Sequence, residues 1–373
     1  MHKRFENELK VELELQDRSQ FHNLPIHNTC TDLDISVIVP VYNVENFIEQ
    51  CAESILKQQS NFTWEIIFIN DGSTDDSRNT LQKVIKKWQI KNANKNAKYK
   101  PDIRLIEQAN QGAAIARNNG IRESRGKYLA FIDSDDFLNS SSYLLDMFCA
   151  IQQADADICQ EGYVQLINNK QVVTEWNPEW NYSEDYKDFY KLPGYFWGKL
   201  IRKSLFDSVC IPEGRAFEDT IVQMILFPRC KKFCLIPNAD YVYRLNPNSV
   251  TYQKNKNNRG VDAVLVMDDL LTMVNAIHLK TNAFWYEAFI HHFGLIFFTR
   301  IRHCDPVIMK KAYLLSCDLQ DEAANITGIS YFRPYDGQDF AAQHRLFTWW
   351  YCRCVCHKLI EKSQKECKKL LKR

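Results

Sequence analysis

The chain has 373 residues, of which 45% are hydrophobic and 25% are charged. This composition is ordinary for a globular protein and excludes a mainly disordered, collagen-like or coiled-coil architecture. Lysine and arginine total 47 against 46 aspartate and glutamate, so no overall basic charge indicates binding to nucleic acid.

The N-terminal segment, residues 1–33, is polar. Phe5, Leu9 and Leu13 recur at helical spacing before a turn-rich stretch around Pro25, which predicts a helical leader followed by a linker. The segment lacks the apolar core of a signal peptide, and no stretch approaches the roughly 20 apolar residues of a membrane-spanning helix. We therefore expect a cytoplasmic protein.

From residue 34 onward, apolar runs typical of buried strands alternate with segments of helical periodicity. The predicted strands are 35–41, 64–69, 103–106 and 128–132. The predicted helices are 47–56, 81–88, 113–124 and 143–151. This alternation predicts βαβ units and an α/β fold with a doubly wound, mostly parallel, Rossmann-like sheet.

The pattern changes after residue 155. Residues 157–167 and 171–176 flank the turn residues Asn168 and Asn169, which predicts a hairpin. Aromatic loops and short helices follow, including a helix at 220–227, and from residue 255 the chain is predicted to be mostly helical.

Polar, loop-forming residues follow three of the predicted strands. They are Pro40-Val41-Tyr42-Asn43, Asn70-Asp71-Gly72-Ser73 and the cluster that begins at Asp133. Open α/β sheets bind ligands at the carboxyl ends of their strands. We therefore predict the functional site at this edge of the sheet.

Asp133-Ser134-Asp135 comes directly after a buried strand. Two carboxylates one residue apart can bind Mg²⁺ or Mn²⁺ and leave positions open for phosphate oxygens. Asp and Ser are also common turn and cap residues, so the motif by itself leaves both interpretations open.

Asp71 and Arg117 also allow two interpretations each. Asp71 can accept hydrogen bonds from a base or a ribose hydroxyl, or cap the following helix. Arg117 can face a diphosphate or be a solvated surface arginine.

The chain strongly resembles the family-2 inverting glycosyltransferases of the GT-A fold, in particular the bacterial enzymes that build capsular and lipopolysaccharide glycans. The resemblance covers about residues 34–252 and depends on four ordered motifs, with weaker matches at Trp197-Gly198-Lys199, Phe217-Glu218-Asp219 and Tyr243-Arg244. The four motifs are Ser36 to Asn43, Ile69 to Asp75, Asn110-Gln111-Gly112 through Ala116-Arg117-Asn118, and Gly126 through Asp133-Ser134-Asp135-Asp136.

The resemblance implies a nucleotide-sugar site at the predicted edge of the sheet. The residues that it places around the donor are Pro40, Tyr42, Asn43, Asp71, Gly112, Arg117, Asp133, Ser134, Asp135 and Arg244. Asp133 would contact the ribose, and Asp135, with Asp133 beside it, would hold Mn²⁺ or Mg²⁺. For Arg244 we consider contact with the diphosphate and a structural ion pair equally.

Glu218-Asp219 matches the acidic catalytic pair of the family, which implies Asp219 as the catalytic base. An inverting transfer needs a carboxylate opposite the leaving diphosphate to take the proton of the acceptor hydroxyl. Acidic residues at the start of a helix also stabilise its dipole, which is the alternative for this pair. Trp197 and Lys199 would border the acceptor, although Trp197 also suits a core position.

The C-terminal segment combines Trp349-Trp350-Tyr351 with apolar residues near helical spacing and a basic face. Interfacial helices have this composition, and so does a surface helix with solvated lysines. We favour docking on the inner face of an anionic membrane.

The resulting expectation has three regions: a leader at 1–33, a GT-A domain at 34–254 with donor (34–150) and acceptor (151–254) halves, and a helical region at 255–373. The protein would transfer a sugar, from UDP-hexose or UDP-N-acetylhexosamine, to a growing surface polysaccharide or lipopolysaccharide. The alternative is a non-catalytic partner that binds nucleotide-sugar and organises a glycan assembly complex. Nucleotidyl transfer is disfavoured, because Val41 to Val44 contains neither Gly nor Lys.

Overall fold

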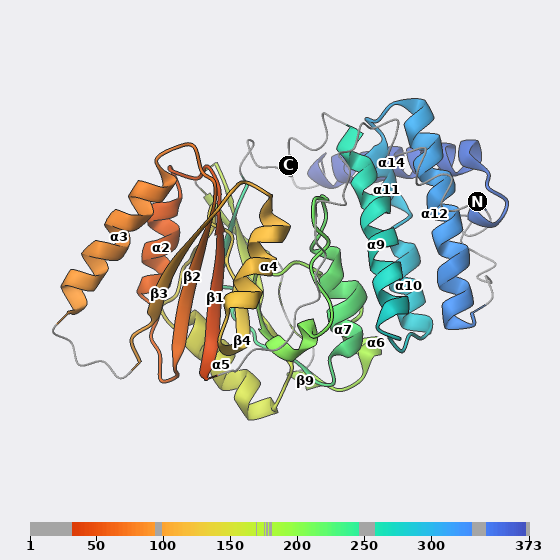
Figure 1. Ribbon diagram of the computed structural model, residues 1–373. Helices are drawn as coiled ribbons and strands as arrows, with labels where there is room; N and C mark the ends of the chain where they lie inside the picture. Colours follow the sequence, from red (N-terminus) through yellow and green to blue (C-terminus); the bar gives the residue numbers. More distant parts are fainter. Residues whose placement is uncertain are drawn as a thin grey trace. The chain divides into compact units, whose positions relative to one another are not determined.

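A computed structural model describes residues 32–93, 99–168, 170–174, 176, 178, 181–245, 258–329 and 341–370. The predicted leader and the loop after Leu245 lie outside these residues. The described residues form two compact units: an α/β unit of 32–214 and 218–245, and a helical unit of 215–217 and 258–370. Each unit is described below by itself (Figure 1).

The α/β unit is built on an eight-stranded sheet in the order β3-β2-β1-β4-β10-β6-β11-β9. Four neighbouring strands are parallel: β1 (Leu33–Val41), β2 (Trp64–Asp71), β3 (Asp102–Gln108) and β4 (Gly126–Phe131). The remaining strands are β10 (Lys199–Arg202), β6 (Ile158–Gln160), β11 (Phe233–Leu235) and β9 (Tyr182–Ser183), and β10 is antiparallel to both of its neighbours. The predicted mostly parallel sheet is therefore confirmed.

Helices cover both faces of the parallel strands (Figure 1). On one face, α2 (Ile48–Leu56), α3 (Ser77–Asn92) and α5 (Tyr143–Ala154) bury apolar side chains against alternate residues of β1 and β2. On the other face lies α4 (Ala113–Glu123), where Gly120 approaches Ile38 and Ile69 so closely that a Cβ would meet them at 2.5 and 3.0 Å. Every residue of β2 is buried, as expected for a strand covered on both faces.

A second sheet has the order β5-β12-β7-β8. Its strands are β5 (Phe137–Leu138), β12 (Tyr241–Arg244), β7 (Tyr163–Ile167) and β8 (Lys170–Val173). The short helical segments of this unit are α6 (Tyr186–Phe189), η2 (Lys203–Phe206), η3 (Val222–Leu226) and α7 (Phe227–Arg229).

The predicted hairpin at 157–176 is only partly correct. The antiparallel pair β7 and β8 forms around Asn168, which has a φ of 48°. The predicted first strand, however, is divided: β6 belongs to the large sheet and β7 to the small one. Between them lies the buried Glu161, whose Oε1 accepts the backbone N–H groups of Asp240 and Tyr241 at 2.9 Å. Burial raises the pKa of Glu161 to about 8.

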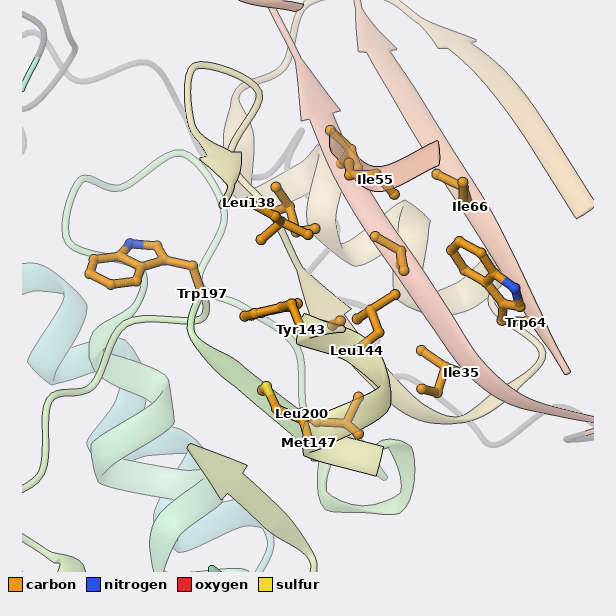
Figure 2. Packing of buried hydrophobic residues seen from close by; sticks show 14 of the residues in the cluster. Ile35, Ile55, Trp64, Ile66, Leu138, Tyr143, Leu144, Met147, Trp197 and Leu200 are labelled. Carbon is orange, nitrogen blue, oxygen red and sulfur yellow. The ribbon is translucent and has the colours of Figure 1, made fainter. Parts of the chain in front are cut away.

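One apolar core cluster of the α/β unit is contributed mainly by β1, β2, β4, α2, α3 and α5. Figure 2 shows its side chains meeting between the strands and the helices, with Ile66 on β2 and Leu144 and Met147 on α5. These three side chains are fully buried. This packing fixes the strands whose carboxyl ends carry the polar loops.

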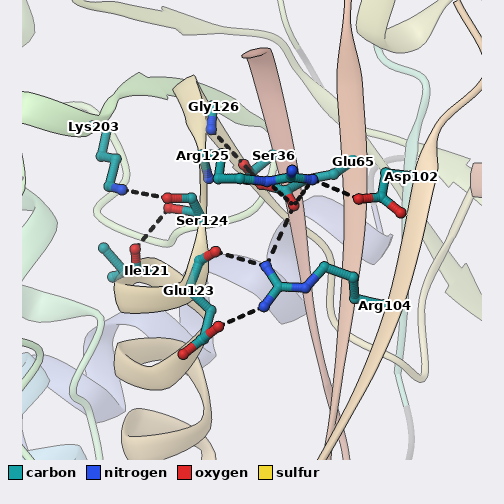
Figure 3. Close-up of polar contacts among 10 residues, drawn as sticks. All are labelled: Ser36, Glu65, Asp102, Arg104, Ile121, Glu123, Ser124, Arg125, Gly126 and Lys203. Carbon is teal, nitrogen blue, oxygen red and sulfur yellow. Dashed lines mark hydrogen bonds and ion pairs between the residues drawn. The ribbon is translucent and has the colours of Figure 1, made fainter. Parts of the chain in front are cut away.

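A buried ion-pair network stabilises the opposite end of the same strands (Figure 3). Glu65, fully buried at the start of β2, accepts hydrogen bonds from Ser36 Oγ and Arg125 N, both at 2.7 Å. Arg125 Nη2 also lies 3.1 Å from Glu65 and 2.5 Å from Asp102. The network lies at the amino ends of the strands and is separate from the predicted site.

The helical unit contains η5 (Asn258–Val261), α9 (Asp262–Ala276), α10 (Ala283–His291), α11 (Leu295–Ile301), α12 (Pro306–Thr327) and α14 (Phe347–Leu370). Strong signals define α12: Asp305 caps the N-terminus by accepting from Val307 N, Pro306 follows, and Gly328 ends the helix with a φ of 66°. None of the described helices is both long enough and apolar enough to cross a membrane.

The core assignment predicts unequal effects for two isoleucines. Ile66→Ala should lower the free energy of unfolding by about 2 to 5 kcal/mol, because a fully buried side chain is lost and a cavity is left. Ile90→Ala is the matched control: Ile90 is 69% exposed on α3, and the change should stay within about 0.5 kcal/mol. Denaturant titration measures both, and equal losses would contradict the assignment.

Candidate functional site

The carboxyl ends of β1, β2 and β4 meet at one edge of the sheet, as predicted, because these strands are parallel neighbours. Pro40 is the penultimate residue of β1, and Tyr42, just beyond the strand, is 43% exposed. Asn43 has a φ of 50°, and its backbone N–H donates to Ser73 Oγ at 3.2 Å. Its side-chain oxygen accepts from Thr74 N at 2.8 Å. The loops after β1 and β2 therefore hold each other in place.

Asp71, the last residue of β2, shapes the turn before α4. Its carboxylate accepts the backbone N–H groups of Gln111 and Gly112 and the side-chain amide of Gln108, each at 2.8 Å. Gly112 has a φ of 94°, a conformation that favours glycine. Asp71 is only 2% exposed. Its hydrogen bonds give it a loop-forming role, and its contact with a nucleotide stays a prediction.

The acidic cluster after β4 is held from beneath by Tyr241 on β12. The Tyr241 hydroxyl donates to Asp136 Oδ2 at 2.7 Å and accepts from Asp133 N at 3.2 Å. Asp136 Oδ1 also accepts from Arg244 N at 2.7 Å. Burial, reinforced by the charges of Asp135 and Asp133, raises the pKa of Asp136 well above its ordinary value. Ser134, between the two predicted ligands, is 6% exposed.

The carboxylate of Asp135 differs in its contacts from those of Asp133 and Asp136. Within the described part of the chain, no other side chain forms a hydrogen bond or ion pair with it. Burial and the negative charge of Asp133 raise the pKa of Asp135 to about 6. A half-buried carboxylate of this kind fits a hard divalent cation, which would neutralise the local excess of negative charge.

The described residues contain no group of three or more His, Cys, Asp or Glu side chains arranged to hold a metal ion. The predicted donor set of Asp135 with Asp133 stays a prediction, and two carboxylates would leave other positions of an ion open. This suits Mg²⁺ or Mn²⁺, which often bind through one or two carboxylates together with substrate phosphates.

Arg117 on α4 connects two acidic groups that are far apart in sequence. Its Nη2 lies 2.7 Å from Asp133 Oδ1, and its Nη1 lies 2.9 Å from Glu218 Oε1. Burial opposes the charged form, but the two carboxylates outweigh it and raise the pKa of Arg117 above its ordinary value. The side chain is only 8% exposed, so the alternative of a solvated surface arginine is wrong.

Glu218 and Asp219 precede a helical segment, as predicted, although residues 222–226 form a π-helix. Phe217, directly before them, has a φ of 67°, an uncommon conformation for a residue other than glycine. Both features occur often near functional sites. Through Arg117, the structure thus brings Glu218 close to the acidic cluster after β4.

Lys199 and Trp197 are both buried at the start of β10. Lys199 has 0% exposure, and its Nζ donates to the backbone oxygen of Tyr195 at 2.8 Å. Burial lowers the pKa of Lys199 to about 7, an effect that the charge of Asp219 opposes. Trp197 is 9% exposed and stacks on Tyr195, with ring centroids 3.9 Å apart. Trp197 belongs to the core cluster, so an acceptor could reach this region more readily at the half-buried Tyr195.

Arg244, the last residue of β12, lies beside the acidic cluster. Its Nε donates to Asp135 O and its Nη2 to Gln50 Oε1, both at 2.8 Å. The guanidinium also lies over the ring of Phe47, 4.8 Å from its centroid. Within the described residues, the guanidinium of Arg244 donates to uncharged oxygens. The structural ion pair considered for Arg244 from the sequence is therefore not found there.

Three contributors were missed by sequence reasoning: Asp136, Tyr195 and Tyr241. Asp136 was part of the recognised motif but received no role. The alternation Tyr241-Val242-Tyr243 indicated that two tyrosines face the same side of a strand, yet nothing in the sequence revealed that this strand lies under Asp133. Tyr195, in a loop rich in aromatic residues, gave no signal of its own.

The buried lysine predicts a pH-dependent stability. The pKa of Lys199 is about 7 when folded and 10.5 ordinarily, so between these values the unfolded chain binds more protons and stability rises with pH. Lys199→Met should therefore be more stable than the wild type near pH 7. The difference should shrink toward pH 10, with a slope of up to about 1.4 kcal/mol per pH unit.

Denaturant titrations across this pH range measure the effect. Lys57→Met, at a side chain 68% exposed, is the control for loss of a positive charge. If the difference in unfolding free energy between wild type and Lys199→Met stayed constant with pH, the pKa of Lys199 would not be lowered in the folded protein.

Comparison with known proteins agrees with this geometry. Residues 36–210 match the model of glycosyl transferase family 2. The Bacillus subtilis protein EpsJ, named an uncharacterized glycosyltransferase, is 33% identical over 233 residues, covering 58% of this chain and 62% of EpsJ. The poly(ribitol-phosphate) beta-glucosyltransferase of Bacillus spizizenii is 28% identical over 258 residues, covering 66% of this chain and 38% of that protein. The chain thus spans less than two thirds of the length of either relative.

Among solved structures, S. aureus TarS 1-349 in complex with UDP matches with a TM-score of 0.62 at 18% identity, covering 83% of this chain and 87% of TarS 1-349. The complex of TarS 1-349 with UDP-GlcNAc has a TM-score of 0.51 at 20% identity, covering 80% and 93% of the two chains. At such identities the likeness shows the fold. Residues 36–210 therefore resemble glycosyl transferase family 2, and the chain shares the GT-A fold of TarS.

Proposed function

We propose that this protein is an inverting glycosyltransferase that moves a sugar from a UDP-sugar, a UDP-hexose or UDP-N-acetylhexosamine, to a growing cell-surface polysaccharide or lipopolysaccharide. The observation that carries the proposal is the joining of two acidic groups, Asp133 to Asp136 and Glu218-Asp219, through Arg117. A transferase needs such a pair of groups, one for the leaving diphosphate and one for the acceptor. The UDP and UDP-GlcNAc complexes of TarS and the named activity of the Bacillus spizizenii relative support the class of donor and acceptor.

The donor would lie at the carboxyl ends of β1, β2 and β4. The exposed Tyr42 and the linked loops at Asn43 and Asp71 are suited to the base and ribose. Asp133 and Asp135 would face the diphosphate through Mn²⁺ or Mg²⁺, which when bound stabilises the negative charge of the leaving group. Arg244, held beside Asp135 by a bond to its backbone oxygen, adds positive charge on the same side.

Asp219 would act as the base. Its carboxylate accepts the proton of the acceptor hydroxyl while the acceptor oxygen bonds to the anomeric carbon and the bond from that carbon to the diphosphate breaks. The nucleoside diphosphate leaves, and single displacement inverts the configuration. Glu218 was included with the catalytic residues from the sequence, and its carboxylate pairs with Arg117 at 2.9 Å. We assign the proton-accepting role to Asp219 because it matches the catalytic base of the family that the chain resembles.

Docking on an anionic membrane remains part of the proposal, with different contacts from those first expected. Trp350 is 2% exposed and packs within the helical unit, where its Nε1 donates to Phe293 O. It is therefore not available as an anchor. Trp349, Leu359 and Ile360 on α14 are 43%, 63% and 56% exposed, and these side chains are available to a lipid surface.

The enzyme proposal predicts nucleotide release from one member of a panel of UDP-, GDP-, CMP- and dTDP-sugars with Mn²⁺, abolished by EDTA. Asp219→Asn should reduce release by about 10²- to 10⁴-fold, because the general base is lost, while calorimetry shows UDP binding retained. Asp135→Ala should lose both release and metal-dependent UDP binding.

Asp102→Asn, at the opposite end of the sheet in the Arg125 pair, is the matched control and should keep full release. Nucleotide release by Asp219→Asn at the wild-type rate would disprove the role of Asp219. UDP binding without release from any sugar, even with glycan acceptors added, would favour the non-catalytic partner.

The membrane proposal predicts that the full chain floats with vesicles containing phosphatidylglycerol, and that Leu359→Ser/Ile360→Ser reduces the floating fraction at least about threefold, because buried apolar area drives interfacial binding. The matched control is Val172→Ser/Val173→Ser, at exposed apolar residues of β8. Equal flotation of both double variants and the wild type would remove α14 from the proposal.

A further inference from the structure

The guanidinium of Arg117 lies between two carboxylates from different parts of the chain. Asp133 follows β4 and lies 16 residues from Arg117 in sequence, whereas Glu218 lies 101 residues away. Each carboxylate is bonded to a different terminal nitrogen of the same side chain, at 2.7 and 2.9 Å. The guanidinium also lies over the ring of Phe196, 5.5 Å from its centroid.

We propose that Arg117 is a positioning residue that couples the donor side of the site to the segment carrying Glu218 and Asp219. The inference rests on the proposed function for its meaning in catalysis, but the coupling itself is a property of the fold. Through Arg117, a donor that engages Asp133 would restrain Glu218, and with it the neighbouring Asp219.

The geometry requires arginine. A planar guanidinium presents several N–H donors in a fixed fork, so it can bond two carboxylates on separate nitrogens while a ring packs on its face. A lysine ammonium is a single point charge on a flexible stem and would not hold both carboxylates in fixed directions. Burial strengthens both ion pairs, because solvent does not screen them.

The charges at this position also favour coupling. One guanidinium pairs with both the Asp133 and the Glu218 carboxylates, so the two carboxylates compete for the same cation. Among the described residues, the buried Arg117 Nε has no hydrogen-bond partner, so this part of the chain does not satisfy every donor of the guanidinium. A change in charge beside Asp133, such as the arrival of a divalent cation and a diphosphate, therefore alters the interaction of Arg117 with Glu218.

This role explains a division of labour within the two acidic motifs. Asp133 and Glu218 each commit an oxygen to Arg117, whereas no other described side chain pairs with the Asp135 carboxylate. Asp133 and Glu218 thus orient the two motifs through Arg117, and the proposed chemistry falls to the neighbouring Asp135 and Asp219. By thermodynamic reciprocity, a ligand on either side of Arg117 affects the other side equally.

Amide hydrogen exchange with and without UDP and Mn²⁺ tests the coupling without requiring turnover. In the wild type, UDP with Mn²⁺ should slow exchange in a peptide covering 218–226. In Arg117→Gln, this peptide should exchange about ten- to hundredfold faster in the free protein, because two charge-assisted hydrogen bonds are lost. Protection by UDP should also disappear there, although UDP still protects the loops after β1 and β2.

Two further variants separate positioning from general destabilisation. Arg117→Lys keeps the charge and should fold, yet it should lose most of the UDP-induced protection at 218–226. Arg125→Gln removes an arginine of the Glu65 pair at the other end of the strands and should leave the protection at 218–226 unchanged. Undiminished UDP-induced protection at 218–226 in Arg117→Lys, or its equal loss in Arg125→Gln, would overturn the proposal.

Kinetics give a second readout if the donor panel identifies a substrate. Arg117→Lys should lower kcat for nucleotide release about ten- to hundredfold, as expected for a misplaced catalytic group, with KM for the donor changed less than threefold. A change in KM alone would mean that Arg117 only binds the donor, which would overturn the positioning role. Suppose that Arg117→Lys loses the UDP-induced protection at 218–226, but neither the wild type nor any variant turns over a donor. This result would support the positioning role of Arg117 and reject the proposed enzyme.

Discussion

The site depends on one constraint, the parallel direction of β2, β1 and β4. Parallel neighbours end at the same edge of a sheet, so the residues that follow these strands must converge there. The fully buried β2 and the apolar cluster beneath it hold the strands in register. The buried Glu65 network secures their opposite ends. The polar loops therefore start from fixed points, and this allows short side chains such as Asp71 and Asn43 to link them.

Convergence alone would leave an accumulation of negative charge. Asp133, Asp135 and Asp136 follow one another, and Glu218 is brought close to them. The fold offsets part of this charge with Arg117 and Arg244 and with the Tyr241 hydroxyl, while the Asp135 carboxylate is left without a side-chain partner in the described chain. Burial makes the remaining charge costly, which the raised pKa of Asp135 reflects. In the proposed function, a bound cation and diphosphate would complete this balance of charge.

The aromatic residues around Trp197 pack beneath the acidic cluster and support it. Trp197 stacks between Tyr195 and Tyr241, with ring centroids 3.9 and 4.9 Å away. Tyr241 in turn bonds to Asp136. A tryptophan predicted at the acceptor surface thus supports the acidic cluster through a stacked neighbour. Lys199, predicted beside it, lies fully buried, donates to the backbone oxygen of Tyr195 and interacts electrostatically with Asp219.

The sequence by itself determined the parallel strands, the helices between them and the edge where the site lies. These features depend on local periodicity and on the rule that parallel strands end together, which need no knowledge of distant contacts. Only the tertiary structure decided which side chains meet. The pairing of Arg117 with Glu218, the division of residues 157–167 between two sheets and the burial of Trp350 each depend on segments far apart in the chain. A periodic pattern shows that a residue is apolar or charged, but its partner is chosen by how the elements pack.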